Sequence, residues 1–363
     1  MERENVIQKD LELRNLPELF SGGDRQKWGQ QRGKILDVLE NEVYGKTPEF
    51  TGKVYSFVES RMESGFGGTA IKEWIRLSFE TPAGMYSFPF QLIFPKTEGK
   101  KPVFVHLAFQ QKTLSALNSD ELNEYMPLEE ILDNGYIVAN LFYENVTSDT
   151  PERNGLACAY PETEGSWGKI GMWAFAASRV VDYLLTRPEV DPKRIAVTGW
   201  SRLGKTALWC GAQDERFSVV ISTESGCGGA AIHRGKEGEK ISDITQRFPY
   251  WFCKKYQSFC GHESDASFDQ HFLLACVAPR TLLIGSAQED QWADPKSEFL
   301  SVISASSVYQ KLGKRGIEFP ERYPQAGQRY LDGDVGYWIR KGGHGVIRED
   351  WIVQMNYRVI HGV

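Results

Sequence analysis

The spacing of hydrophobic residues changes near residue 50. Before it, apolar side chains recur about every 3.6 residues, as in an amphipathic helix, at Ile35, Leu36, Leu39 and Val43. Between residues 53 and 95 apolar and polar residues alternate, which predicts strands over 72–82 and 85–95. Because only a short segment with Pro82 and Gly84 separates these strands, we expect an antiparallel hairpin. The first 100 residues thus predict a helical and hairpin lead-in.

Beyond residue 100 the chain contains short, continuous apolar runs separated by helix-like segments. The runs cover 101–109, 135–143, 194–200, 217–223 and 280–287. Such an alternation is typical of a mostly parallel sheet with helices on both faces. Residues 166–194 predict one crossover helix, ended by Pro188 and followed by a turn at Asp191–Pro192. Because no repeat or linker interrupts the chain, we expect residues 1–363 to form one α/β domain, with 1–100 as its extension.

Chemistry in such a sheet is expected just beyond the carboxyl ends of its strands. The run 194–200 leads into Gly199–Lys205, with sequence GWSRLGK, and then into a helix-like segment. A serine in a tight turn between strand and helix is the context of a nucleophile elbow, where backbone N–H groups stabilise an oxyanion. The second glycine, Gly204, falls one residue later than in the usual G-x-S-x-G pattern. The alternative is that Ser201 only caps the helix.

A nucleophilic serine needs a general base. In proteins with a nucleophile elbow the acid and then the histidine follow the serine along the chain. His344 fits this order, because it lies in a glycine-rich segment, 340–345, between a strand-like run and the last helix-like segment. The alternative is that His344 is a loop histidine exposed to solvent.

The third member of the predicted triad has two candidates. Glu224 follows the apolar run 217–223, and Asp290 follows the run 280–287. Because neighbouring parallel strands lie about 5 Å apart, either carboxylate could reach the same imidazole. Asp290 is slightly favoured, since it follows the strand that usually carries the acid in folds with this elbow, and Glu224 stays open.

Composition narrows the possible partners. The chain has 42 Lys and Arg against 48 Asp and Glu, a net charge of −6 without a basic block, so we expect no nucleic-acid partner. No apolar stretch is long enough to span a membrane, and residues 1–16 lack the apolar region of a signal peptide. We therefore expect a cytoplasmic protein, unless a leader preceded this sequence.

The six cysteines form no CxxC pair and are expected to be mostly buried thiols.

Several motifs, in this order and spacing, resemble the glucuronoyl esterases of carbohydrate esterase family 15 (CE15). They are GWSRLGK at 199–205, ESGCGGAA at 224–231, FDQHFLLACVAPR at 268–280, Asp290 with Trp292, and His344. The similarity extends from about residue 101 to the C-terminus. It implies an α/β-hydrolase fold and ester hydrolysis without a metal or another cofactor.

The resemblance also implies roles for individual residues. It makes Ser201 the nucleophile, gives Arg202 a place in the oxyanion hole and assigns Lys205 to the sugar hydroxyls. The tryptophan that packs on the sugar ring would be Trp292. Glu224 matches the catalytic acid of fungal members, whereas some bacterial members use the position of Asp290.

Two positions depart from the family pattern. Fungal members have a disulfide whose cysteines correspond to Trp200 and Gly345, so that disulfide cannot form here. A glutamate that contacts the sugar in the family aligns near Arg247, in the segment QRFPYWF. We expect Arg247 to contact the substrate. Because its charge is opposite to that of the family's glutamate, the exact ester stays open.

Taken together, the sequence predicts a serine-dependent carbohydrate esterase. The main hypothesis is hydrolysis of 4-O-methylglucuronoyl esters of xylan through an acyl-enzyme on Ser201, with a glucuronoxylan fragment as the substrate. One alternative is an acetyl xylan or other glycan acetyl esterase with the same machinery. A further alternative is a catalytically silent carbohydrate-binding relative. We expect a second oxyanion donor at 109–111, and we expect Trp200 and Trp292 in the cleft.

Overall fold

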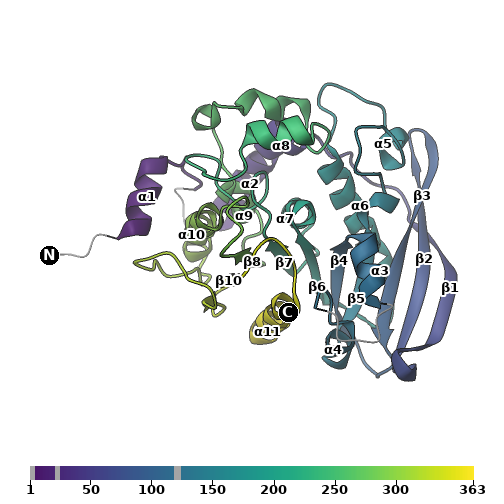
Figure 1. The fold of residues 1–363 in the computed structure, drawn as a ribbon. Coiled ribbons are helices and arrows are strands. Elements are labelled where there is room, and N and C mark those ends of the chain that lie inside the picture. The colour runs from purple at the N-terminus through teal and green to yellow at the C-terminus, as the bar shows by residue number, and fades with distance from the viewer. Residues whose placement is uncertain (1–4, 21–24, 118–123) are drawn as a thin grey trace.

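A ten-stranded sheet forms the centre of the computed structural model, which describes residues 5–20, 25–117 and 124–363. Its strand order is β1-β2-β3-β5-β4-β6-β7-β8-β10-β9 (Figure 1). The strands are β1 (Tyr55–Gly65), β2 (Ala70–Thr81), β3 (Gly84–Pro95), β4 (Lys101–Ala108), β5 (Ile137–Phe142), β6 (Val190–Trp200), β7 (Val219–Thr223), β8 (Thr281–Ala287), β9 (Arg329–Tyr330) and β10 (Val335–Arg340).

The sheet combines an antiparallel edge with a parallel centre. β1, β2, β3 and β5 pair antiparallel, and β2 and β3 form the predicted hairpin, with Thr81 opposite Gly84. From β5 through β4, β6, β7 and β8 to β10 every pairing is parallel. The predicted parallel sheet is thus confirmed, and the N-terminal hairpin belongs to the same sheet.

Helices cover both faces of the sheet. They are α1 (Val6–Arg14), α2 (Arg25–Leu39), α3 (Gln110–Leu117), α4 (Leu128–Asp133), α5 (Leu156–Ala159), α6 (Lys169–Leu184), α7 (Arg202–Gln213), α8 (Ile241–Arg247), α9 (His271–Ala275), α10 (Pro295–Lys311) and α11 (Arg348–His361). A π-helical turn, Glu40–Tyr44, continues α2, and shorter 3-10 turns lie at Phe66–Gly68, Tyr143–Asn145, Lys254–Phe259 and Glu263–Asp265.

Two hydrophobic cores lie between the sheet and these helices. Successive residues of a strand point to opposite faces, so Val103 and Val105 join one core and Phe104 joins the other. The first core includes apolar side chains of α6, α7 and α10, and the second includes those of α4 and α11. This double burial explains why the central strands appear in the sequence as continuous apolar runs.

One local expectation differs from the structure. Asp191–Pro192, the predicted turn, lies inside β6, where the register with β4 shifts between Lys101 and Val103. A proline is tolerated there because the irregular pairing does not need its missing N–H.

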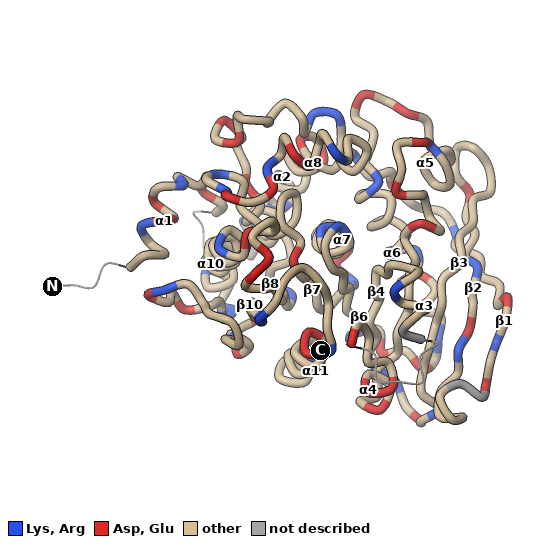
Figure 2. The backbone as a smooth tube through the Cα atoms, in the orientation of Figure 1, with Lys and Arg blue, Asp and Glu red and all other residues tan. Residues whose placement is uncertain are grey.

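Charged residues and cysteines are distributed as the sequence predicts. Lys and Arg positions are interspersed with Asp and Glu along the backbone (Figure 2). Among the described helices, none is long and apolar enough to cross a membrane. All six cysteines are free thiols; Cys158 is exposed, Cys260 is partly buried and the other four are buried, as predicted.

Candidate active site

The turn after β6 presents Ser201 in a constrained conformation. The serine has φ 60° and ψ −126°, and α7 begins at the next residue. A Cβ on Gly199 would lie 2.2 Å from the carbonyl oxygen of Leu203, so the turn requires glycine there. The Ser201 hydroxyl makes no hydrogen bond that caps α7. The alternative of an ordinary helix cap is therefore wrong.

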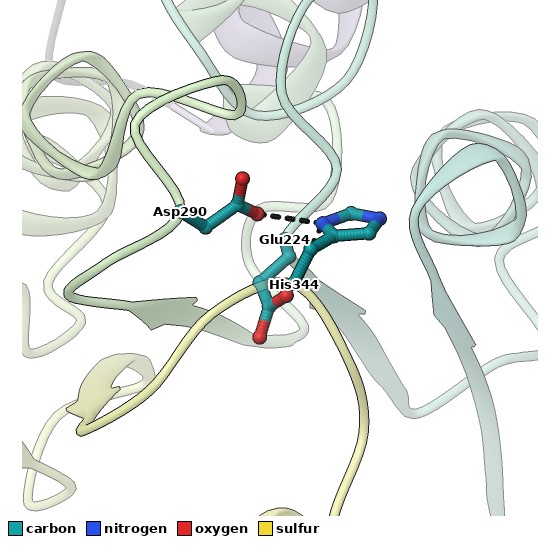
Figure 3. A group of neighbouring side chains, drawn as sticks. All are labelled: Glu224, Asp290 and His344. Carbon is teal, nitrogen blue, oxygen red and sulfur yellow. Dashed lines mark hydrogen bonds and ion pairs between the residues drawn. The ribbon is translucent and has the colours of Figure 1, made fainter.

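His344 connects Ser201 to the two predicted acids. Its Nε2 lies 3.0 Å from Ser201 Oγ. Its Nδ1 lies 2.6 Å from Asp290 Oδ2 and 3.3 Å from Glu224 Oε2. Figure 3 shows both carboxylates near the same ring nitrogen, with the other nitrogen pointing away from them. The structure thus brings together Ser201, His344 and both candidate acids.

The loop with Asp290 and the loop with His344 are joined by backbone hydrogen bonds. The N–H groups of Gln288 and Glu289 donate to the carbonyl oxygens of Arg340 and Gly342, each at 2.9 Å. The Asp290 carboxylate also accepts the N–H of Ala293 at 3.2 Å. β8 and β10 are parallel neighbours, so their carboxyl ends place these two loops side by side.

Glu224 has a different set of partners from Asp290. Its buried carboxylate accepts from Arg340 Nη2 at 2.6 Å and from the backbone N–H of Gly345 at 2.7 Å. Arg340 also bonds Asp350, at 3.1 Å. Glu224 therefore fixes the backbone beside the imidazole, whereas Asp290 makes the shorter contact with the imidazole itself.

The electrostatics of the cluster favour a charged His344. Burial lowers the pKa of His344, but the hydrogen bonds to Asp290 and Glu224 outweigh it and raise this pKa to about 9. Burial raises the pKa of Asp290, but the hydrogen bond to His344 and the positive charge of His344 together have the larger effect. The pKa of Asp290 therefore lies below its ordinary value. For Glu224 burial dominates and raises the pKa. A carboxylate at Asp290 beside an imidazolium is the arrangement that stabilises the proton taken from a serine.

Oxygen and nitrogen atoms of Glu224, Asp290 and His344 lie within 4.8 Å of one another, a spacing that could hold a metal ion. Each oxygen of Glu224 already accepts a hydrogen bond, one of them from the cationic Arg340, which disfavours a second cation at this carboxylate. His344 Nε2 lies at Ser201 and not in the cluster. The donor set therefore fits a hydrogen-bonded triad better than a cation site.

Arg202 is held beside Ser201 by a partner that the sequence did not reveal. Its guanidinium forms an ion pair with Asp149 and lies 4.7 Å from the Trp251 ring. Trp251 donates its own N–H to Asp149 Oδ1 at 2.6 Å. Arg202 Nε is buried and has no hydrogen-bond partner among the described residues.

The start of α3 also lies close to Ser201. The Phe109 ring, one residue before α3, lies 5.1 Å from the Trp200 ring and 5.7 Å from the Arg202 guanidinium. The backbone predicted to donate to the oxyanion, at 109–111, is therefore near the elbow. Its donor role stays a prediction.

Lys205 and Trp292 are linked through Glu239. Lys205 is buried, donates to the carbonyl oxygen of Ser225 and lies 3.9 Å from Glu239 Oε2. The N–H of Glu239 donates to the carbonyl oxygen of Trp292 at 2.8 Å. The Trp292 side chain is half exposed, and the Arg247 guanidinium lies 6.0 Å from its ring. Arg247 is exposed, so it lies on the solvent side of Lys205, Glu239 and Trp292.

Glu239 and Asp149 are the site residues that sequence reasoning missed. Glu239 stands in the charged segment GKEGEK, which looks like an ordinary polar loop. In the structure the neighbouring Gly238 shows how closely this loop packs against Trp292, because a Cβ there would lie 2.3 Å from the Trp292 carbonyl oxygen. The loop that holds Glu239 thus places a carboxylate beside Lys205.

The chain is similar to known carbohydrate esterases in sequence. A family model described as glucuronyl esterase of fungi matches residues 125–313. Carbohydrate esterase MZ0003, from an unknown prokaryotic organism, is 32% identical over 93% of this chain and 85% of its own length. The 4-O-methyl-glucuronoyl methylesterase 1 of Wolfiporia cocos is 34% identical over 42% of this chain and 39% of its own length.

Solved structures give the same result for the fold. A promiscuous CE15 esterase from a marine bacterial metagenome superposes with a TM-score of 0.84 and 30% identity, over 95% of this chain and 96% of that one. The glucuronoyl esterase from Solibacter usitatus superposes with a TM-score of 0.84 and 33% identity, over 95% and 97%. The predicted α/β-hydrolase fold is therefore confirmed.

Proposed function

Because the chain belongs to the glucuronoyl esterase family, CE15, a family of carboxylic ester hydrolases, we propose that it hydrolyses 4-O-methylglucuronoyl esters of xylan. The observation that carries this proposal is the continuous line of contacts from Asp290 through His344 to Ser201, next to Lys205 and Trp292. The names of similar proteins supply the ester class, since Wolfiporia cocos has a 4-O-methyl-glucuronoyl methylesterase.

The first half of the reaction forms an acyl-enzyme. Ser201 Oγ attacks the ester carbonyl carbon while His344 Nε2 accepts the hydroxyl proton. The carbonyl oxygen becomes an oxyanion, which Arg202 and the N–H groups near the start of α3 stabilise. When the tetrahedral intermediate collapses, the protonated His344 gives its proton to the departing alcohol oxygen.

The second half regenerates the enzyme. A water molecule gives a proton to His344 Nε2 and attacks the acyl carbon. The same oxyanion donors act again, and the second tetrahedral intermediate releases the uronic acid and returns the proton to Ser201. Asp290 stays ionised throughout and stabilises the imidazolium that forms in each half.

The sugar is proposed to bind between Lys205 and Trp292. Lys205 and Glu239 offer a donor and acceptors to neighbouring hydroxyls, and the half-exposed Trp292 offers a flat apolar surface to a pyranose ring. Burial lowers the pKa of Lys205, and the charge of Glu239 opposes this effect. Arg247, beside Trp292, is proposed to donate hydrogen bonds to sugar hydroxyls, because the esterified carboxyl of the substrate is neutral and lies at Ser201.

The decisive experiment compares uronate and acetyl esters. Benzyl glucuronate, acetylated xylan and p-nitrophenyl acetate are assayed with the wild type, Ser201→Ala and the exposed control Ser258→Ala. We expect uronate-ester hydrolysis that is lost in Ser201→Ala and kept in Ser258→Ala. Activity on acetyl esters alone would contradict the proposed substrate and retain the mechanism. No hydrolysis of any ester would favour the catalytically silent carbohydrate-binding relative.

A further inference from the structure

A buried lysine lies at the start of α6 and takes no part in the proposed chemistry. Lys169 is the first residue of this helix and is only 4% exposed. Burial lowers its pKa, and the helix dipole disfavours a positive charge at the N-terminal end of a helix. A cation in this place needs strong partners, and these are backbone carbonyl groups.

Three carbonyl groups of one loop bind the Lys169 ammonium. Its Nζ donates to the carbonyl oxygens of Ser148, Thr150 and Glu152, at 2.6, 2.5 and 2.9 Å. The side chains of Thr150 and Glu152 are exposed, so the loop has few buried apolar contacts to hold it. Because the acceptors belong to alternate residues, the one ammonium fixes the backbone of the whole loop 148–152.

This loop carries Asp149, the partner of Arg202. The Tyr250 hydroxyl donates to the carbonyl oxygen of Asp149 at 2.9 Å. Lys169 contacts Tyr250 twice, because its backbone N–H donates to the Tyr250 carbonyl oxygen at 2.9 Å and its Nζ lies 5.2 Å from the centre of the Tyr250 ring. A shift of this loop would therefore move the carboxylate that holds the Arg202 guanidinium beside Ser201.

We propose that Lys169 is a positioning residue for oxyanion stabilisation: it fixes the loop 148–152, so that Asp149 keeps the Arg202 guanidinium directed at the oxyanion. The Tyr250 hydroxyl supports the same loop. The inference deepens the proposed function and rests on it. Because Lys169 is assigned no contact with the substrate, its loss weakens transition-state stabilisation and leaves sugar binding unchanged.

The first test is Lys169→Met, which keeps an unbranched side chain and removes the three N–H donors. kcat and KM are measured for benzyl glucuronate and p-nitrophenyl acetate. We expect kcat to fall about tenfold for both esters, a part of the roughly 10²-fold cost of losing one oxyanion donor, with KM within about twofold of the wild type. A higher KM with an unchanged kcat, or no change in either constant, would refute the positioning role.

The matched control is Lys254→Met. The side chain of Lys254 is 76% exposed and forms an ion pair with Glu162. We expect both kinetic constants of this variant to equal those of the wild type. A tenfold loss of kcat in Lys254→Met as well would show that the effect does not depend on the loop that Lys169 holds, and would overturn the proposal.

The same substitution in an Arg202→Ala background separates a role through Arg202 from general support of the fold. If Lys169 acts through Arg202, Lys169→Met should lower kcat by less than about twofold there, because the group that it positions is already gone. Thermal unfolding of each variant verifies that folded protein is assayed. An equal loss of kcat with and without Arg202 would show that Lys169 supports only the fold.

Tyr250→Phe provides a second variant if Lys169→Met does not fold. It removes the hydroxyl that binds the Asp149 carbonyl oxygen and keeps the ring. We expect kcat to fall about threefold, as for the loss of one ordinary hydrogen bond, and this loss should also disappear in the Arg202→Ala background. A loss that persists in that background would overturn the proposal.

The two esters distinguish failure of the positioning role from failure of the proposed function. If the wild type cleaves only p-nitrophenyl acetate, the uronate assignment fails, and an Arg202-dependent loss of kcat on the acetate would still support the role of Lys169. If the wild type cleaves both esters and Lys169→Met is equally active, the role alone is refuted. No hydrolysis of either ester by the wild type would refute both.

Discussion

Asp290 Oδ2 lies 2.6 Å from His344 Nδ1, whereas the nearest oxygen of Glu224 lies 3.3 Å from the same atom. Both carboxylates therefore face one imidazole nitrogen, but they are held differently. Glu224 is also paired with Arg340 and accepts the N–H of Gly345. This division suggests that Asp290 is the acid of the triad and that Glu224 holds the loop that carries the base.

Asp290→Asn should therefore lower kcat by about 10⁴-fold, because the amide no longer stabilises the imidazolium and favours the wrong tautomer. Glu224→Gln should lower kcat less but also lower the melting temperature, because it removes the negative charge that faces the buried Arg340. Steady-state kinetics and thermal unfolding of the two variants test this difference. A larger loss of kcat in Glu224→Gln would assign the triad to Glu224.

The raised pKa of His344 predicts an alkaline pH profile. The base must be neutral to accept the Ser201 proton, and with a pKa of about 9 its neutral fraction falls about tenfold for each pH unit below that value. We expect kcat/KM to rise from pH 7 to about 9 and then level off. Asp290→Asn removes the strongest cause of the raised pKa, so the rise should move to lower pH. A wild-type inflection near 6.5 would contradict this account.

Much of the catalytic machinery could be predicted because it depends on local pattern. Ser201 stands in a glycine-flanked turn after a buried strand, and His344 follows the strand-like run 336–340 in a glycine-rich loop. The choice between Glu224 and Asp290 could not be made, because parallel strands bring both to one place and only the distances to His344 separate them. Asp191–Pro192 was mistaken for a turn because a register shift is not visible in composition.

The missed residues share another property: they act through contacts distant in sequence. Asp149 is 53 positions from Arg202, and Glu239 is 34 positions from Lys205. Each stands among polar neighbours in a loop, so nothing in the local pattern distinguishes it from a solvated acid. Their buried pairing with a cation becomes apparent only when the loops are folded over the sheet.

Asp149 is predicted to act through Arg202. Asp149→Asn weakens the ion pair that holds the guanidinium beside Ser201, so transition-state stabilisation should fall while substrate binding changes little. We expect kcat to decrease by about 10²-fold, the usual cost of disturbing one oxyanion donor, with KM within a small factor of the wild type. Double-mutant analysis with Arg202→Ala measures the coupling. Additive losses in the double variant would show that Asp149 acts independently of Arg202.

Glu239 is predicted to decide how well the sugar binds. In Glu239→Gln the carboxylate that faces Lys205 is gone, so the pKa of the buried Lys205, already lowered, should fall further and weaken its hydrogen bonds to sugar hydroxyls. KM for a uronate ester should rise about tenfold, since each hydrogen bond to a charged group contributes roughly 1.5–3 kcal/mol. The exposed Glu237, two residues away, provides the matched control Glu237→Gln. Because p-nitrophenyl acetate has no sugar, its KM should change little in either variant, and an equal rise for both substrates would show that Glu239 supports the fold rather than the sugar.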